Sequence, residues 1–446
     1  MHPIIKSAVL GSKGDIFGVR WDKRDSPLLT RTGASRGMVA AAGIGMNLVK
    51  NDFDHAPILG EIITEVDTLG NYFQRIPKFY IRKEDVAGYK TIEFCKTQRP
   101  GFYLPWCFWD FTNNRELSYY DHGKYKASKD GSSKLCSVPN VFPLINDNIV
   151  NFRTFAQNNN TGGLLGYQQL DIHVVDVLRT LMLVEFANLN IQTVMQGYTT
   201  GNYVATHVAT VAESGVNRII IANAFADTYR VGQPISVGTT AGAQNVMTNR
   251  IITSIDVYDA SNKAIVFDGA AVNITIGNVV YNVAWKNGFS SGIAASSGSL
   301  VANDGKSPCV YRGIESPFGD MWQFVDGVNI NEYQAWVCKN AAQYASNVFA
   351  SPYEQLSYVN HNANGYVAEM GFDINNPFAE FATSITGADA AKYYADYYYQ
   401  ATGQRIALFG GAWVNGAAAG PSYWFLDASS SGTALTFGGR LVRKAL

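Results

Sequence analysis

Hydrophobic and polar residues alternate along much of the chain in short runs, the pattern expected of β-strands. The first run is IFGVRW, in which Phe17, Val19 and Trp21 share one face before a Ser-Pro turn. Further short runs with aromatic ends occupy residues 51–144, among them YFQRIPKFYIRK and GFYLPWCFWDF. The pattern therefore predicts an early strand followed by a block of short strands separated by turns.

Seven aromatic residues of this block raise a choice between a sugar-binding platform and core packing. Alternating aromatics in strands normally fill one buried face, so core packing is the expected role of most of them. They are Phe79, Tyr80, Phe102, Tyr103, Trp106, Phe108 and Trp109.

A helical period replaces the alternation at residues 149–158 and 171–187. The second helix is apolar nearly all round, which predicts a helix buried in the core. We expect His173, near its start, to be a partnered structural histidine. We expect Glu185 to accept hydrogen bonds from buried backbone or hydroxyl groups, because no second acid or base lies at a spacing that would make it a catalyst.

Residues 202–307 contain only strand patterns, in seven short runs separated by Gly, Asn and Asp turns. This spacing predicts a small β-barrel or sandwich. Because related motifs flank the stretch on both sides, it indicates a domain inserted into another domain. We expect a spacer or assembly role for it, with a second binding module as the alternative.

Residues 309–337 return to the earlier pattern, and Trp322 and Phe324 alternate in a strand that should enter the core and pair with the C-terminal sheet. Residues 393–399 hold more Tyr than one core face accommodates. Some of these rings should therefore face solvent or a subunit boundary.

The segment 405–443 opens with an apolar run and a Gly-Gly pair, crosses two Trp residues and three consecutive Ser residues, and returns through a second Gly-Gly pair. Glycine pairs let backbones approach where a side chain would block them. We expect two strands to frame a display surface on which the intervening residues are free to vary. The alternative is a Gly/Ser-rich hairpin that only closes a domain.

The amino-acid composition limits the classes of partner that the protein can bind. Hydrophobic residues make up 47% of the 446, enough for a large core and two or three domains, but charged residues make up only 16%. Ser, Thr, Asn, Gly and Tyr must cover much of the surface, which suits adaptable recognition or burial by neighbours in an assembly. A formal net charge of -1 removes the attraction that nucleic-acid binding needs, so we expect no nucleic-acid partner.

The cysteines and the chain start bear on localisation. Five cysteines without metal-ligand spacing predict reduced, mostly buried thiols in a chain made in a cytosol. The start lacks the apolar core of a signal peptide, and no uninterrupted apolar span reaches membrane length. We therefore expect no membrane insertion, and any extracellular role to come through lysis or assembly into a particle.

Sequence motifs of catalysis are not found. The six histidines show no H-x-x-x-H spacing, and no nucleophile elbow, P-loop or dinucleotide-binding fingerprint occurs. We assign no catalytic residue, no metal ligand and no cofactor, and we do not expect an enzyme. Separated acids such as Asp396 and Asp427 could still meet in space, which leaves a glycan-cleaving enzyme open.

Several motifs resemble C-type-lectin-like domains of phage tail proteins, including those diversified by retroelements. They are IPKFY and PGFYLP, the run RGIESPFGDMWQFVDG, which is similar to a core strand of the formylglycine-generating-enzyme fold, and the GG-x-W and GGRL elements of residues 405–443. The resemblance covers about residues 51–200 and 309–446. Enzymes share this fold, but Cys309 and Cys338 do not occupy their catalytic positions, and no E-P-N or Q-P-D tripeptide of calcium-dependent sugar binding is present.

The resemblance implies a phage tail adhesin that recognises a bacterial cell-surface receptor, protein or glycan. Such a protein is made in the bacterial host cytoplasm, joins other tail proteins in the virion at the tail tip or fibre, and is often a homotrimer. The alternatives are a structural virion protein without receptor binding and a glycan-acting enzyme on the same fold.

The resemblance also places the receptor-binding positions within residues 405–443, where retroelement-diversified codons would fall. Phe425 is the expected anchor, because an exposed aromatic among small residues offers the area that hot spots use. The positions are Ala412, Val414, Asn415, Ala418, Ser422, Phe425, Asp427, Ala428, Gly432, Ala434 and Thr436.

These inferences together predict an α+β protein: a C-type-lectin-like domain interrupted by an all-β inserted domain, with a short N-terminal arm. The arm is expected at residues 1–50, the two parts of the lectin-like domain at 51–201 and 308–446, and the insertion at 202–307.

Overall fold

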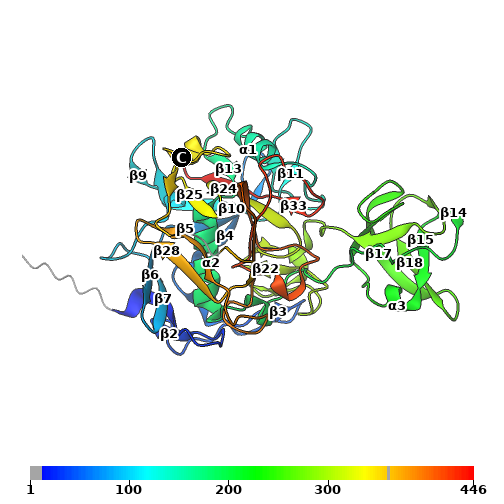
Figure 1. Cartoon of the computed structure of the whole chain (residues 1–446), viewed down its shortest axis with the longest axis horizontal. Coiled ribbons are helices and arrows are strands. Elements are labelled where there is room, and N and C mark those ends of the chain that lie inside the picture. Colours follow the sequence, from blue (N-terminus) through cyan, green and yellow to red (C-terminus); the bar gives the residue numbers. More distant parts are fainter. Residues whose placement is uncertain (1–12, 359–361) are drawn as a thin grey trace, which may run out of the picture.

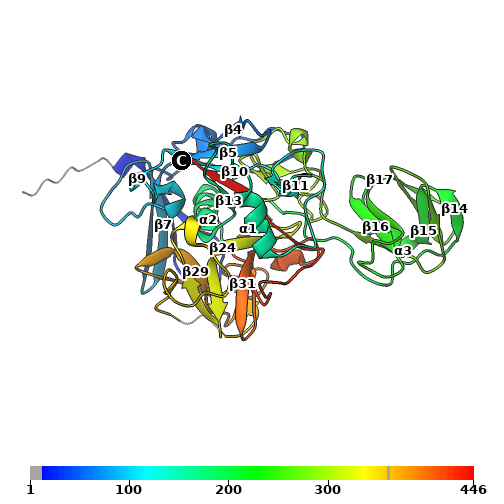
Figure 2. The ribbon, with the colours of Figure 1, turned by 90° about the horizontal axis from the view of Figure 1, so that it is seen from above.

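A computed structural model gives the structure of residues 13–358 and 362–446. The protein is rich in β-structure with few helices. Figure 1 shows a main body of several sheets and a smaller β lobe joined to it by a narrow connection, and Figure 2 shows the same separation from above. Residues 1–12, the start of the predicted N-terminal arm, lie outside the described residues.

Helix α2 (Ile172–Phe186) runs through the main body, and all 15 of its residues are buried. The Asp171 side chain accepts a hydrogen bond from the Val174 amide at its start, and Ala187 ends it in the left-handed conformation. The predicted buried helix is confirmed, as is the preceding one, α1 (Ile149–Gln157).

Three sheets contribute buried residues to the core of the main body. The first has the order β2 (Thr30–Gly33), β1 (Ile16–Trp21), β7 (Tyr89–Cys95), β6 (Tyr80–Val86). The second has the order β13 (Tyr167–Gln169), β34 (Leu441–Lys444), β10 (Tyr119–Gly123), β5 (Tyr72–Pro77), β4 (Ile63–Val66). The third has the order β26 (Glu354–Gln355), β25 (Gln334–Val337), β24 (Trp322–Asn331), β31 (Gln404–Phe409), β32 (Trp424–Leu426), β30 (Tyr397–Gln400), β27 (Gly365–Tyr366), with β33 (Phe437–Gly438) also paired to β24.

Smaller pieces complete the main body. The hairpin of β28 (Glu369–Asp373) and β29 (Asn376–Ser384) packs against α2. A four-stranded sheet has the order β23 (Ile314–Glu315), β22 (Cys309–Tyr311), β21 (Gly298–Ser299), β3 (Gly43–Ile44). Short pairs are formed by β8 (Trp109–Asp110) with β9 (Arg115–Glu116) and by β11 (Ser128–Lys129) with β12 (Leu135–Cys136).

The N-terminal strand is predicted correctly, but residues 13–50, the described part of the predicted arm, do not form a separate arm. Phe17, Val19 and Trp21 are buried, and β1 lies between β2 and β7 inside its sheet. Further along, β3 pairs in parallel with β21. The described part of the predicted arm therefore belongs to the main body, because its alternating apolar face finds its partners there.

Residues 202–283 form the β lobe. Its main sheet has the order β15 (Arg218–Ala222), β18 (Asn262–Phe267), β17 (Met247–Val257), β16 (Pro234–Gly238), β20 (Val279–Asn282), beside the pair β14 (Glu213–Val216) and β19 (Val272–Ile274) and the short helix α3 (Asn223–Ala226). The lobe has a hydrophobic core of its own. Its two ends meet where the Asn282 amide donates to the Asn202 carbonyl at 2.7 Å. The first of the seven expected strands, VATHVATVA at residues 204–212, is reduced to an isolated bridge at Val208.

The segment 284–307, which the sequence assigned to the insertion, packs with the main body instead. Trp285 contacts Tyr198 with ring centroids 5.3 Å apart, and its amide donates to Asp320 at 2.8 Å. β21, in the same segment, joins a main-body sheet. The apolar run VVYNVAW crosses the boundary without a break, so the sequence pattern hides it.

A buried ionic cluster surrounds α2. Glu380 on β29 accepts hydrogen bonds from Lys83 at 2.9 Å, Lys90 at 2.5 Å and Arg179 at 2.7 Å. Asp176 accepts from Lys83 as well. Burial opposes the ionisation of Glu380, but the three cations outweigh it and hold the pKa of Glu380 well below its usual value.

Glu380→Gln removes this charge and keeps the side-chain shape. We expect the free energy of unfolding at neutral pH to fall by about 3–5 kcal/mol, because three buried cations lose their shared counter-ion. Glu354→Gln, at a partly exposed ion pair with Lys339, is the control and should cost at most about 1 kcal/mol. Urea denaturation measures both.

The pH dependence follows from the depressed pKa of Glu380 in the folded state. The contribution of the Glu380 carboxylate to the free energy of unfolding is fully present above the ordinary carboxyl pKa. It is lost as the pH falls toward the pKa that Glu380 has in the folded protein. The stability gap between wild type and Glu380→Gln should therefore be constant near neutral pH and narrow in acid. A gap that widens on acidification would contradict the arrangement.

Candidate functional site

The segment 405–443 joins two sheets. β31 lies between β24 and β32, β33 pairs in parallel with β24, and β34 lies between β13 and β10 in another sheet. The predicted pairing of the Trp322 strand with the C-terminal sheet is confirmed by β24 and β31. The segment is thus an integral part of the main body and not a surface hairpin that closes it.

Arg440 anchors the end of this segment and is fully buried. Its guanidinium donates to Gln323 at 2.8 Å and to the carbonyl oxygens of Gly123 and Glu315 at 2.9 and 2.8 Å. Burial lowers the pKa of Arg440 to about 9, so the group remains charged at neutral pH. A Cβ on Gly439 would lie 2.6 Å from the Phe152 ring, which explains the glycine beside it.

Five partly exposed aromatic residues from four strands of the third sheet form a surface that we call the aromatic face. Its members are Tyr366, Tyr397, Tyr399, Phe425 and Phe437. Successive side chains of a strand point to opposite faces of the sheet, so Tyr398 and Trp424 lie on the other face, where they are buried.

Ring contacts join the members of the aromatic face in two groups, which the buried Tyr423 and Trp322 link. Tyr399 and Phe425 are stacked, with centroids 5.4 Å apart and planes at 7°. Phe425 contacts Phe437 at 5.9 Å, and Tyr366 contacts Tyr397 at 5.3 Å. The face therefore offers apolar ring area together with phenol hydroxyls, a combination that suits binding surfaces.

Two buried aromatics support this face. Trp322, 4% exposed, contacts Tyr423 at 4.5 Å and Phe425 at 5.3 Å. The predicted core placement of Trp322 is confirmed. Burial and the neighbouring phenols raise the pKa of Tyr423 above its usual value, so its hydroxyl stays neutral.

Eight of the predicted receptor-binding positions carry accessible surface. Val414 is 42% exposed, and the others are partly exposed. They are Asn415, Ala418, Phe425, Asp427, Gly432, Ala434 and Thr436. All except Phe425 lie outside the strands, in or beside the loops that follow β31 and β32.

Three predicted positions are wrong as display positions because they are buried. Ala412 is fully buried where its amide donates to the Asn415 side chain at 2.7 Å. Ser422 is held from two sides, since its amide donates to Asp396 and its hydroxyl accepts from Arg179. Ala428 is 8% exposed and its carbonyl accepts from the Ile406 amide. These three residues belong to the buried structure that supports the surface.

The sequence reasoning missed four members of the aromatic face. The Tyr-dense run did predict that some rings face solvent, and the alternation of Tyr397 and Tyr399 with buried Tyr398 bears this out. Their position beside Phe425 depends on the parallel pairing of β30 with β32, which no local pattern reveals. Tyr366 and Phe437 arrive from other segments in the same way.

The lobe borders this site. Leu435, in the loop after β32, packs against Val279, Tyr281 and Val283 at the base of the lobe. Arg230 of the lobe also donates to Asp304 of the main body at 3.1 Å. The loop that carries Ala434 and Thr436 thus lies next to the inserted domain.

The acids that left an enzyme open have separate partners. The Asp396 carboxyl is buried, accepts from the Ser422 amide at 2.6 Å, and has a pKa raised well above its usual value by burial. Asp427 is partly exposed and lies 3.9 Å from Arg405. Nothing in these contacts pairs the two carboxyls for acid and base roles.

Structural roles also fit the titratable residues of α2. His173 lies 3.3 Å from the Cys338 carbonyl and 4.1 Å from the Phe378 ring, and burial lowers the pKa of His173 well below its usual value. Glu185 accepts hydrogen bonds from the side chains of Asn51 and Arg312, charged and amide donors that the sequence did not indicate. The five cysteines are free thiols, four of them buried.

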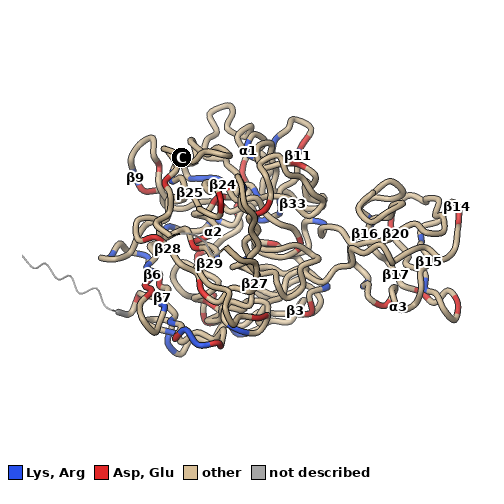
Figure 3. The backbone as a smooth tube through the Cα atoms, viewed as in Figure 1, with Lys and Arg blue, Asp and Glu red and all other residues tan. Residues whose placement is uncertain are grey.

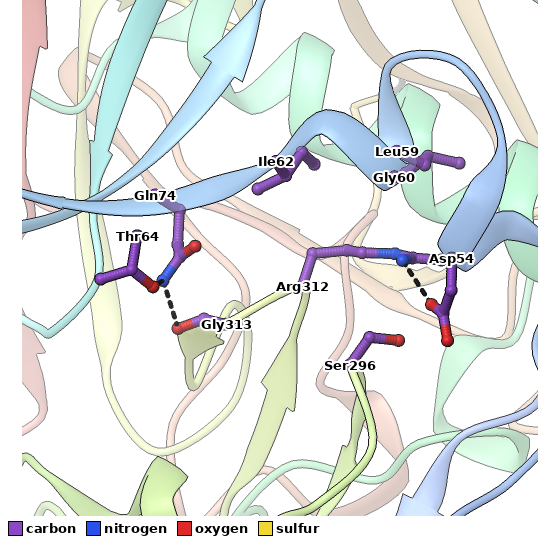
Figure 4. Close-up of a pocket in the computed structure, with 9 residues that line it drawn as sticks. All are labelled: Asp54, Leu59, Gly60, Ile62, Thr64, Gln74, Ser296, Arg312 and Gly313. Atoms are coloured by element: carbon purple, nitrogen blue, oxygen red, sulfur yellow. Dashed lines mark hydrogen bonds and ion pairs between the residues drawn. The ribbon is translucent and has the colours of Figure 1, made fainter.

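A pocket with a volume of about 300 Å³ lies beside Arg312. Figure 4 shows the residues that line it. Arg312 donates to Asp54 at 2.6 Å and to both oxygens of Glu185, and Gln74 donates to Thr64 at 2.8 Å. Because its main polar groups pair with one another, this pocket offers a ligand little unpaired hydrogen-bonding capacity. In residues 13–358 and 362–446, no three His, Cys, Asp or Glu side chains gather as metal ligands do.

Charged residues of both signs are scattered over the main body and the lobe in Figure 3. Within the described residues, no helix has the length and apolar character needed to cross a membrane.

No protein-family model matches the sequence, and no curated protein matches it.

Arg440→Met tests whether Arg440 anchors the end of the segment 405–443. We expect it to lower the free energy of unfolding by at least about 3 kcal/mol, because several buried carbonyl oxygens lose their donor. Arg405→Met, at a partly exposed residue of β31, is the matched control and should cost at most about 1 kcal/mol. Equal denaturation midpoints for the two variants would show that Arg440 does not anchor the segment.

Proposed function

We propose that the protein is a phage tail adhesin that recognises a bacterial surface receptor through the aromatic face and the loops beside it. The observation that carries the proposal is a set of five partly exposed rings fixed on a buried base. Tyr and Phe rings supply large contact area at a low cost in side-chain entropy, and such residues dominate binding hot spots.

The sequence motifs support the finer parts of this proposal. The run that resembles lectin-like phage proteins covers β23, the loop after it and the first part of β24, and the GG-x-W and GGRL elements flank the loops of the site. On this basis we assign the main body to the C-type-lectin-like fold. A homotrimer on the virion would present several copies of one weak site, and their simultaneous binding would give a high overall affinity for the cell surface.

Retroelement diversification is part of the same proposal. Val414, Ala418 and Asp427 have accessible surface outside the strands, so changes there leave the sheet pairing intact. Surface substitutions of this kind usually alter stability by no more than about 0.5 kcal/mol. The three buried positions are excluded from the variable set.

The structural alternative makes a different prediction for the same surface. A virion component without receptor binding would use the aromatic face as a contact between subunits. It would then be needed for particle assembly and not for adsorption of the free protein.

A pair of matched double variants tests the proposal. Tyr399→Ser with Val414→Ser alters the proposed site, and Tyr258→Ser with Val257→Ser removes the same residue types from an exposed part of the lobe. Adsorption of purified protein to susceptible cells should weaken by at least about tenfold in the first and stay unchanged in the second, because ring contacts are lost only there.

Thermal melting of both variants provides the folding control, and both should melt close to wild type. Equal adsorption of wild type and the Tyr399/Val414 variant would overturn the receptor-surface proposal. Loss of particle assembly with unchanged adsorption would favour the structural alternative.

A further inference from the structure

A second aromatic site lies on the main body, at a pocket of about 340 Å³ that none of the aromatic-face residues line. It involves the aromatic block for which the sequence favours core packing. Phe79, Phe102 and Phe108 are buried as expected. Trp106 and Trp109, by contrast, are only partly buried and line this pocket.

The two Trp rings form a corner. Their planes are perpendicular, at 89°, with centroids 6.0 Å apart. Trp106 lies on the 3-10 turn Trp106–Phe108 and Trp109 begins β8. Opposite them, the turn between β28 and β29 brings Asn375 and Ile374, which is 87% exposed, to the rim.

Contacts behind the pocket hold its walls in place. Trp106 stacks on Phe111 with centroids 5.3 Å apart, and its carbonyl accepts from Lys444 at 2.8 Å. Tyr103, which also lines the pocket, donates its hydroxyl to Asp176 at 2.7 Å. The site is therefore formed before any ligand arrives, as small-molecule sites usually are.

The polar groups of the pocket are balanced in charge. Glu116 accepts from Lys78 at 2.6 Å and from the Tyr80 hydroxyl at 2.8 Å. Glu116 is exposed, and although some desolvation opposes its ionisation, these two hydrogen bonds outweigh that effect and lower the pKa of Glu116. Gln98 and Asn375 add side-chain amides, each a donor and an acceptor.

This chemistry selects one class of ligand. A sugar hydroxyl both donates and accepts hydrogen bonds, and the C–H groups of a pyranose form an apolar patch that fits against an aromatic ring. A carboxylate, two amides and a Trp corner offer the complementary groups. A pocket of about 340 Å³ also lies at the small end of the usual range of about 300–1,000 Å³ for ligand sites.

A cationic ligand is the competing class, because aromatic rings with a carboxylate bind quaternary ammonium groups. Here the carboxylate is already held by an ammonium group, that of Lys78 at 2.6 Å. The local charge is therefore balanced, which favours an uncharged ligand over a cation or an anion.

We propose that this pocket binds a neutral saccharide of one or two pyranose rings, which lies against Trp109 and hydrogen-bonds to Glu116 and Asn375. The proposal stands apart from the receptor-binding role of the aromatic face. It gives the chain a glycan contact on another part of the main body.

The test is titration of the full-length protein, followed by intrinsic tryptophan fluorescence. The probes are the methyl glycosides of glucose, galactose and mannose, N-acetylglucosamine, maltose and lactose, with choline and glucose 6-phosphate as charged comparators. We expect at least one neutral sugar to give saturable binding, and the charged comparators to bind more weakly.

Trp109→Ala and Glu116→Gln should each weaken that binding by about tenfold or more, through loss of the ring surface and of the charged acceptor. Tyr258→Ser, on the lobe, should leave it unchanged, and because none of the substituted residues belongs to the aromatic face, a failure here is distinct from a failure of the receptor proposal. Asn375→Ala, at an exposed turn residue, should also weaken binding and serves if Trp109→Ala does not fold.

Three results would overturn the proposal: no saturation with any of the neutral sugars, tighter binding of choline than of every sugar, or sugar binding that survives in Glu116→Gln and Asn375→Ala alike.

Discussion

A helix buried on every side cannot leave its charged residues to water, and this constraint organises the main body. Asp176 is paired with Lys83, Arg179 with Glu380, and Glu185 with Arg312. The partners come from β6, from β29 and from the turn after β22. A buried network of this kind adds little net stability, but the loss of any one member is costly because the others stay buried. It therefore fixes which elements surround the helix.

The same ionic network also contacts the buried side of the candidate recognition site. Arg179 donates to the Ser422 hydroxyl at 3.1 Å, and Ser422 in turn donates its amide to Asp396. Arg440 fixes the far end of the segment. Between these anchors, the aromatic face and its loops pack on buried residues such as Trp322 and keep part of their own surface accessible. This separation allows a rigid frame to carry a surface that can change.

Local patterns in the sequence predicted the elements whose burial is visible from one stretch alone. The all-round apolar helix at 171–187 and the alternation at Phe17, Val19 and Trp21 are of this kind. So is the strand with Trp322. In each case the side chains of one run decide the outcome, because they are buried whichever partner covers them.

What the sequence could not show depends on pairing between distant segments. Ser422 looks like an exposed loop residue until Arg179 lies beneath it, and Tyr399 acquires its place beside Phe425 only through the pairing of β30 with β32. The end of the lobe was misplaced because one apolar run spans the lobe and the main body. Phe425 and the loop positions thus follow from sequence motifs, whereas the other four members of the aromatic face follow from topology.

The most direct test of the central claim is hydroxyl-radical footprinting of the protein, free and bound to envelopes of susceptible cells. The account predicts that Tyr397, Tyr399 and Phe425 react less in the bound state, while Tyr258 on the lobe reacts equally in both. Unchanged reactivity of the aromatic face in the bound state would contradict it.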